Sequence, residues 1–180
     1  MTLHSSSANA VLTDMRCLPR SQHRYYLRLK DPNDVYSIAQ ITASFFPNPE
    51  GVFTGVYELL LNAIEHGNLG LGSADKYMHI RTGTLLTEME RRLSLPEYAD
   101  RTVEVEIIET THSVTVSITD AGNGFDWKSQ IYENHNDTRP HGRGLWIAQQ
   151  SGFDRVHFNN KGNCVTCICY RQYMPRDSRH

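Results

Sequence analysis

Residues 58–68 constrain the fold more than any other segment, because they combine an amphipathic helix with a row of polar side chains. At about 3.6 residues per turn, Glu58, Asn62 and His66 stand at i, i+4 and i+8 and share one helix face. An apolar stripe on the opposite side is typical of a helix that packs on a core. Its members are Phe53, Val56, Tyr57, Leu60, Ala63 and Ile64. The segment therefore predicts a core-facing helix that ends at Gly67 and Asn68.

The polar row of this helix suits a phosphate that carries a metal ion. The amide oxygen of Asn62 is a hard ligand for Mg²⁺, and the carboxylate of Glu58, one turn earlier, can accept a proton or orient a water. A solvated polar face on an ordinary amphipathic helix explains the same residues equally well. The helix alone leaves both interpretations open.

Two glycine-rich segments farther along the chain favour the functional interpretation. Residues 118–125 contain Asp120 and follow a strand-like alternation, and residues 141–147 open an apolar helix. The glycines in these segments are Gly122, Gly124, Gly142 and Gly144. Glycine lets the backbone pass close to a ligand, and the amides at a helix N-terminus favour phosphate. Either segment alone is typical of a turn, so the argument depends on their combination.

In this order, the three segments resemble the N, G1 and G2 boxes of the GHKL ATPase superfamily, which includes gyrases and histidine kinases. The nearest resemblance is to the bacterial anti-sigma serine/threonine kinases of the RsbW and SpoIIAB type, and it covers roughly residues 23 to 172. It implies ATP and Mg²⁺ as cofactors. It also implies a site without a P-loop, and the sequence contains no GxxxxGK[ST] motif.

The resemblance assigns roles to three side chains. Asp120 would accept a hydrogen bond from the exocyclic amine of adenine, Asn62 would be the Mg²⁺ ligand, and Glu58 would be the general base. His66 would either contact a phosphate or cap the helix end, and neither role is favoured.

Further contacts to the nucleotide are implied for glycine-rich, lid and strand residues. They are Gly122, Gly124, Arg139, Gly142, Arg143, Gly144, Leu145 and Asn163. Arg139 and Arg143 lie where a lid could place a cation on the γ-phosphate, although a solvated loop arginine explains Arg143 equally well. Asn163 departs from the family pattern, because family members often carry a threonine after the glycine that corresponds to Gly162.

The hydrophobic patterns predict an α+β fold, a two-layer sandwich in which helices cover one face of a mixed, mostly antiparallel sheet. This is the Bergerat fold that the resemblance implies. We expect strands at residues 23–30, 103–109, 114–120, 153–158 and 163–170. Helices are expected at 31–45, at 84–93 and at 145–150, and the helix that carries Glu58 and Asn62 is expected to begin at Pro49. Residues 126–141 are expected to form a lid. We expect one domain at 22–172, a flexible tail at 1–21 and a frayed tail at 173–180.

Residues 70–100 depart from the short anti-sigma kinases by about one helical hairpin. Gly70, Gly72 and Ser73 predict a loop, and the helix that follows at 84–93 pairs Glu88 with Arg92 at i,i+4. A decoration of the fold is slightly favoured over a partner-docking element as the explanation of this insertion.

Composition limits the partners. A net charge of −2 with 39% hydrophobic residues gives no reason to expect a nucleic-acid or membrane-surface partner. No apolar segment is long enough to span a bilayer. Alternation along a strand puts Cys167 and Cys169 on one face and Cys164 on the other, a poor geometry for zinc and a pattern that fits a reducing cytoplasm.

Three functions compete at this point. The first is a kinase that phosphorylates a STAS-type anti-sigma antagonist protein and that could also bind a sigma factor. The second is an ATP-gated binding module without phosphotransfer. The third and weakest is the catalytic domain of a histidine kinase, because no phosphoacceptor hairpin is found in the roughly twenty residues before the first strand. A homodimer is a further expectation.

Overall fold

The computed structural model describes residues 22–127, 148 and 150–171. The predicted tails at 1–21 and 173–180, most of the predicted lid and the glycine-rich segment at 141–147 lie outside this range. Of the helix expected at 145–150, residues 148 and 150 are described, and both are helical.

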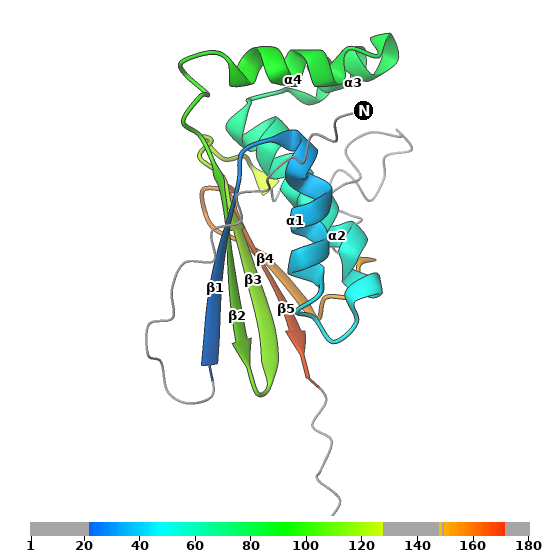
Figure 1. Cartoon of the computed structure of the whole chain (residues 1–180), viewed down its shortest axis with the longest axis vertical. Helices are drawn as coiled ribbons and strands as arrows, with labels where there is room; N and C mark the ends of the chain where they lie inside the picture. Colours follow the sequence, from blue (N-terminus) through cyan, green and yellow to red (C-terminus); the bar gives the residue numbers. More distant parts are fainter. Residues whose placement is uncertain (1–21, 128–147, 149, 172–180) are drawn as a thin grey trace, which may run out of the picture.

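The sheet has five strands in the order β1-β2-β3-β5-β4 (Figure 1). They are β1 (Gln22–Leu29), β2 (Val103–Thr110), β3 (Ser113–Thr119), β4 (Arg155–Phe158) and β5 (Cys164–Tyr170). Within the described residues every pairing is antiparallel, so the parallel component expected of a mixed sheet is not found. The register sets Val105 opposite Ile118 and Val116 opposite Cys167, which keeps the apolar side chains on one face.

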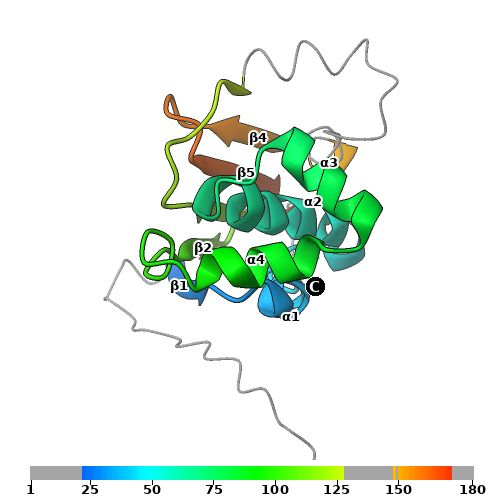
Figure 2. The same ribbon diagram turned by 90° about the horizontal axis from the view of Figure 1, so that it is seen from above.

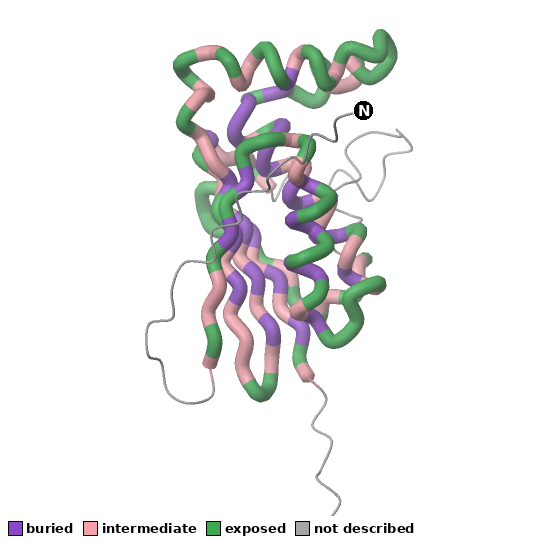
Figure 3. Tube along the Cα trace, viewed as in Figure 1, coloured by how far each residue is buried: buried purple, intermediate pink, exposed green. Residues whose placement is uncertain are grey.

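Helices α1 (Val35–Ala43) and α2 (Pro49–Asn62) form the second layer, on one face of the sheet (Figures 1 and 2). Asp31 caps the N-terminus of the region predicted as a helix at 31–45, where Pro32 opens a short 3-10 turn, η1 (Pro32–Asp34). The core lies between the two layers, where buried residues of the strands face those of the helices (Figure 3). The apolar stripe of α2 is shifted from its predicted position, because Val52 and Leu59 are buried while Phe53 and Tyr57 are only partly so.

Helix α2 continues directly into a π-helical segment, η2 (Ala63–Asn68). The helical run therefore ends at Asn68, close to the stop that the sequence predicts. π-helical turns often occur at functional sites, because the wider turn reorients the side chains that follow it. Here η2 buries two polar residues, Glu65 and Asn68, and of these the sequence predicts only that Asn68 ends the helix.

The insertion is a helical hairpin of α3 (Ser73–Thr82) and α4 (Leu85–Leu93), which lies at one end of the molecule (Figures 1 and 2). Gly83 connects the two helices in a left-handed conformation with φ 68°, which glycine adopts without strain. Ser73 begins α3, so its predicted position in a loop is wrong. Arg92 donates to Glu88 at 2.8 Å, as the i,i+4 spacing predicts. Met89 is the only fully buried residue of these two helices.

The cysteines of β5 have the predicted alternation. Cys167 and Cys169 are buried on the helix-covered face, and Cys164 is half-buried on the other. Burial raises the pKa of Cys167 to about 12. Because a thiolate is the form that binds metal, this favours a structural role for that thiol. None of the described helices has the length and apolar character needed to cross a bilayer.

Candidate functional site

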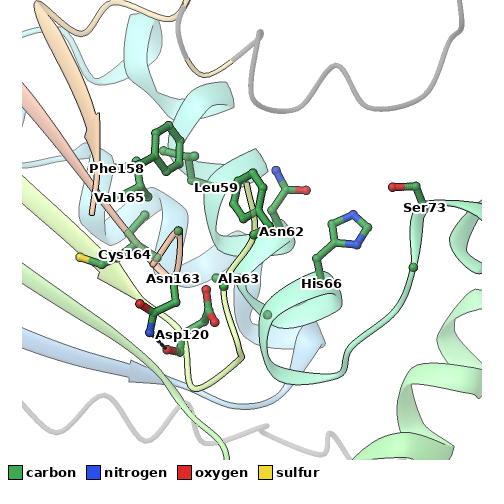
Figure 4. Close-up of a pocket in the computed structure, with 16 residues that line it drawn as sticks. Leu59, Asn62, Ala63, His66, Ser73, Asp120, Phe158, Asn163, Cys164 and Val165 are labelled. Carbon is green, nitrogen blue, oxygen red and sulfur yellow. Dashed lines mark hydrogen bonds between the residues drawn. The ribbon is translucent and has the colours of Figure 1, made fainter. Parts of the chain in front are cut away.

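A pocket of about 290 Å³ lies between the end of the α2–η2 helix and the adjoining ends of β3 and β5 (Figure 4). Four separate parts of the chain line it. Its apolar lining is Leu59, Ala63, Ile118, Phe125, Phe158 and Val165, and its polar side chains are Asn62, His66, Ser73, Asp120 and Asn163. The structure therefore brings four of the sequence-predicted side chains, Asn62, His66, Asp120 and Asn163, into one pocket.

Asp120 follows β3 directly and is half-buried at the floor of the pocket. Its Oδ1 accepts a hydrogen bond of 2.8 Å from the amide of Gly122. Burial raises the pKa of the Asp120 carboxyl, while that hydrogen bond and the charges of Lys161 and Arg101 act in the opposite direction. Within the described residues Oδ2 has no hydrogen-bond partner, so the floor offers a free acceptor.

Asn163 fixes the backbone beside this carboxylate. Its Nδ2 donates to the carbonyl of Asp120 at 3.0 Å, and its own carbonyl accepts from the amide of Asp120, also at 3.0 Å (Figure 4). The side chain is thus turned to the protein backbone. Its predicted contact with the nucleotide remains a prediction, but its position at the pocket wall follows from these two bonds.

The glycines of the floor allow three segments of backbone to meet. A Cβ at Gly67 would lie 2.3 Å from Cγ of Asp120, and a Cβ at Gly122 would lie 2.3 Å from the carbonyl oxygen of Gly67. Gly124 has φ 78°, and a Cβ there would lie 1.9 Å from the carbonyl oxygen of Lys161. A larger residue at any of the three positions would displace the floor. The nucleotide contacts expected of Gly122 and Gly124 stay predictions: Gly124 lines the pocket and Gly122 does not, and both lie close to other backbone.

Asn68 is a floor residue that the sequence analysis treated only as a helix stop. It is 3% exposed, and its Oδ1 accepts from the amide of Ala121 at 2.8 Å. Its carbonyl accepts from Nη1 of Arg101 at 3.0 Å. These bonds hold the loop after β3 against the end of η2. No local signal marks this role, because Ala121 is 53 positions away in the sequence.

Asn62 and His66 extend from the helix into the open side of the pocket, across from Ser73 (Figure 4). Nδ1 of His66 donates to the carbonyl of Leu71, which ties η2 to the chain that follows it. This bond supports the structural role of His66 at the helix end. It leaves Nε2 without a hydrogen-bond partner among the described residues, so a contact with phosphate is still a prediction.

Glu58 is half-buried on α2 and does not line the pocket, although it stands one turn before Asn62. Burial raises the pKa of its carboxyl. The positive charge of Lys76 opposes this rise, and the negative charge of Glu65 adds to it. Asp120 in the pocket and Glu58 on α2 outside its lining are thus both half-buried, and burial raises the pKa of each carboxyl.

Glu65 and Lys76 are a second finding that the sequence analysis missed. Glu65 is 1% exposed and forms an ion pair with Lys76 of α3. The sequence does offer a signal for Glu65, because it stands seven residues after Glu58 on the same helical face. Lys76 could not have been found in this way, because it belongs to the insertion.

Five predicted site residues lie outside the described part of the chain. They are Arg139, Gly142, Arg143, Gly144 and Leu145. Their roles at the phosphates stay predictions.

The described part of the pocket fits an adenine nucleotide. Apolar walls such as Ile118 and Val165 suit a flat ring, and the free acceptor on Asp120 suits an amine. The polar rim near Asn62 suits phosphates, and a single amide oxygen is a reasonable protein ligand for Mg²⁺, which keeps waters and takes phosphate oxygens.

Comparison with known proteins agrees with this fit. The family model for the histidine kinase-like ATPase domain matches residues 50–169, which span α2 to β5 and include every residue that lines the pocket. No curated protein matches the chain. The family match implies that the domain binds ATP. The chain belongs to the family of histidine kinase-like ATPase domains.

Proposed function

We propose that this protein is a cytoplasmic serine/threonine kinase of the anti-sigma factor branch, of the RsbW and SpoIIAB type. Its substrate would be a serine or threonine hydroxyl on a STAS-type anti-sigma antagonist, and a sigma factor would be its second partner. The observation that carries the proposal is the half-buried Glu58 one helical turn before Asn62. A histidine kinase-like ATPase domain needs no such base to bind ATP. Transfer of the phosphoryl group to a hydroxyl does need a base, which accepts the proton of that hydroxyl.

The proposed reaction uses three residues of the described chain. Asp120 would accept from the adenine amine and orient the nucleotide, and Asn62 would hold Mg²⁺ through its amide oxygen. The metal would neutralise charge on the phosphates. Glu58 would accept the proton of the attacking hydroxyl while that oxygen bonds to the γ-phosphorus and the bond to the β–γ bridging oxygen breaks, with ADP as the leaving group.

The environment of Glu58 supports the role of a base. A carboxyl with an ordinary pKa is a weak base at neutral pH, and efficiency improves as the pKa approaches the working pH. Burial shifts the pKa of Glu58 in that direction. The helix face that carries Glu58 also reaches the pocket, because Asn62, one turn after Glu58, lines its wall.

An ATP-gated binding module is the second candidate, and two observations favour it. Glu58 is outside the lining of the pocket. The α3–α4 hairpin also exposes large apolar side chains, Met78, Ile80 and Leu86, which a partner could cover. In this alternative, nucleotide binding changes partner affinity and no phosphoryl group is transferred.

The test is a transfer assay with γ-labelled ATP, Mg²⁺ and the STAS-domain proteins encoded next to this chain. We expect acid-stable label on a serine or threonine of one of them. Acid-labile label would indicate phosphohistidine and the histidine kinase alternative. Absence of transfer, together with an effect of ATP on partner affinity by calorimetry, would replace the kinase proposal with the binding module.

A further inference from the structure

One peptide unit at the floor of the pocket, the unit that joins Asp120 to Ala121, is hydrogen-bonded on both sides by side chains from distant parts of the chain. Its carbonyl oxygen accepts from Nδ2 of Asn163 at 3.0 Å, and its N–H donates to Oδ1 of Asn68 at 2.8 Å. Asn163 stands directly before β5, and Asn68 is the last residue of η2. Two different elements therefore hold this one unit.

These bonds fix the backbone that carries the Asp120 side chain. A peptide unit is planar, so it can change orientation only by rotation about the soft dihedrals on either side of it. The unit before Asp120 is held as well, because the amide of Asp120 donates to the carbonyl of Asn163 at 3.0 Å. With both flanking units held, the direction of the Cα–Cβ bond of Asp120 is held too.

The carboxyl of Asp120 then has little freedom left. It points into the pocket, and its Oδ1 accepts from the amide of Gly122 at 2.8 Å (Figure 4). Oδ2 is the acceptor that stays free among the described residues. The position of this oxygen depends on the loop at 120–122, and that loop depends on Asn68 on the side of η2.

Asn68 is itself firmly placed. It is 3% exposed, so little solvent can compete for its Oδ1. Its carbonyl accepts from Nη1 of Arg101 at 3.0 Å, and the guanidinium group of Arg101 lies over the ring of Tyr98, 4.9 Å from the ring centroid. The backbone of Asn68 is thus held by Arg101 while its side chain holds the loop after β3.

We infer that Asn68 is a positioning residue for the selection of the base. It holds the peptide unit after Asp120 in the orientation that presents the free Oδ2 to an exocyclic amine. The inference rests on the part of the proposed function that makes Asp120 the acceptor for the adenine amine. It does not depend on phosphoryl transfer.

The physical reason is that selection between an amine and a carbonyl needs an acceptor in a fixed position. Hydrogen bonds weaken steeply when they are misaligned, and an acceptor that can turn must first be ordered when an amine binds. An acceptor that turns away also no longer repels a carbonyl oxygen. Loss of the Asn68 side chain should therefore weaken ATP binding more than binding of an analogue with a carbonyl at the same ring position.

The experiment compares the affinities of wild type, Asn68→Ala and Asn68→Asp for ATP and for inosine triphosphate by calorimetry. Inosine triphosphate has a carbonyl oxygen where ATP has the exocyclic amine. Wild type should prefer ATP by at least about tenfold. Asn68→Ala should lower this preference at least about fivefold, because the amide of Ala121 loses its acceptor. Asn68→Asp keeps an oxygen for that amide, so its preference should stay within about threefold of wild type.

Melting temperatures separate positioning from folding. Both substitutions should lower the melting temperature, because Asn68→Ala leaves a buried amide unpaired and Asn68→Asp buries a charge. A role limited to stability would therefore give Asn68→Asp no advantage in base selection. Affinities are measured at a temperature at which circular dichroism shows each variant folded.

Phe46→Leu is the control for a general loss of stability. Phe46 is buried and lies near Glu109, beside the turn between β2 and β3, whereas Asp120 follows the other end of β3. Lost packing should lower the melting temperature. The preference for ATP should stay within about twofold of wild type, because the floor is untouched.

Arg101→Gln provides a second, milder change at the same place. It removes the donor to the Asn68 carbonyl and leaves the Asn68 side chain intact. The preference for ATP should fall by about two- to threefold, less than in Asn68→Ala. This variant keeps the inference testable if Asn68→Ala does not fold.

The outcomes separate the inference from the proposed function. An unchanged preference in Asn68→Ala or, if that variant does not fold, in Arg101→Gln would overturn the inference, as would an equal loss in Asn68→Asp or Phe46→Leu. A wild-type protein without a preference for ATP would remove the role of Asp120 and the inference with it. A wild-type protein that prefers ATP but transfers no phosphate would overturn the kinase proposal and leave the inference standing.

Discussion

The floor of the pocket and the α3–α4 insertion both attach to η2, but by different means. The floor is held by backbone contacts, with Asn68 bonded to the amide of Ala121 and Gly67 packed on Asp120. The insertion is held largely by charged side chains and buries one residue, Met89. Close backbone packing gives a rigid site, whereas a few ion pairs over a small core give an element that can open separately.

The pKa values of the two half-buried carboxyls, Asp120 and Glu58, also show the difference between the floor and the insertion. Burial raises the pKa of both Asp120 and Glu58. The largest opposing effect at Asp120 is a backbone hydrogen bond from Gly122 within the floor, while at Glu58 it is the charge of Lys76 from the insertion. The pKa of Asp120 is thus affected from within the floor, and the pKa of Glu58 is affected by a charge from the insertion.

The largest expected effect is on the rate. Glu58→Gln should slow phosphotransfer by at least about a hundredfold, because general bases contribute about 10²–10⁴-fold. ATP affinity should stay within a few-fold, since Glu58 does not line the pocket. Single-turnover kinetics and calorimetry measure the two quantities. Equal losses of rate and affinity would mean that Glu58 belongs to the nucleotide site itself.

The next prediction concerns nucleotide affinity. Asp120→Asn should weaken ATP binding by about ten- to a hundredfold, because a charge-assisted hydrogen bond contributes roughly 1.5–3 kcal/mol. Calorimetry with ATP and GTP provides the measurement. If both nucleotides bind equally well before and after the substitution, Asp120 does not read the base.

A third prediction tests the rigidity of the floor. Gly67→Ala should destabilise the fold by about 1–3 kcal/mol, the usual cost of forcing extra volume into packed structure. Its Cβ would lie 2.3 Å from Cγ of Asp120, so ATP affinity should fall as well. Gly83→Ala is the control on the insertion, where a Cβ meets nothing within 4 Å and only the left-handed φ resists substitution. An unchanged affinity for Gly67→Ala would show that the floor yields.

The pH profile of transfer gives a smaller and graded effect. Below the raised pKa of Glu58 the carboxyl holds a proton and cannot act as a base, so kcat should fall on an acid limb that lies above the ordinary glutamate range. Glu58→Gln should lack that limb. The same raised pKa affects folding stability in the opposite direction with pH. A raised pKa in the folded state contributes stability at low pH, and this contribution is lost as pH rises through that pKa.

The smallest effect is expected on the exposed face of the insertion. Leu86 is 61% exposed, so Leu86→Ser should change the free energy of unfolding by no more than about 0.5 kcal/mol. Chemical denaturation measures this. A much larger loss would show that the hairpin is packed more like the floor, and the contrast between the two regions would fail.

Much of the fold could be predicted because its signals are local. The helix that carries Glu58 and Asn62 and the Glu88–Arg92 pair each depend on residues within a few positions of one another. Strand alternation likewise predicts which side chains of β3 and β5 are buried. Helical and strand periods are properties of the backbone, so spacing alone carries them.

The α+β fold with a mostly antiparallel sheet was predicted correctly, but the described strands lack the parallel component expected of a mixed sheet, and Ser73 begins a helix rather than lying in a loop. Strand direction depends on how distant segments pair, and α3 has little apolar periodicity from which its start could be predicted.

The sequence by itself determined the helix with its acid and amide one turn apart, and an aspartate at the end of a strand. Only the tertiary structure decided which distant groups complete them. Asn68 bonds to the loop beside Asp120, and Glu65 pairs with Lys76 of the insertion. Such contacts form where layers and insertions meet, and the energy of a buried polar group depends on a partner that no local pattern specifies.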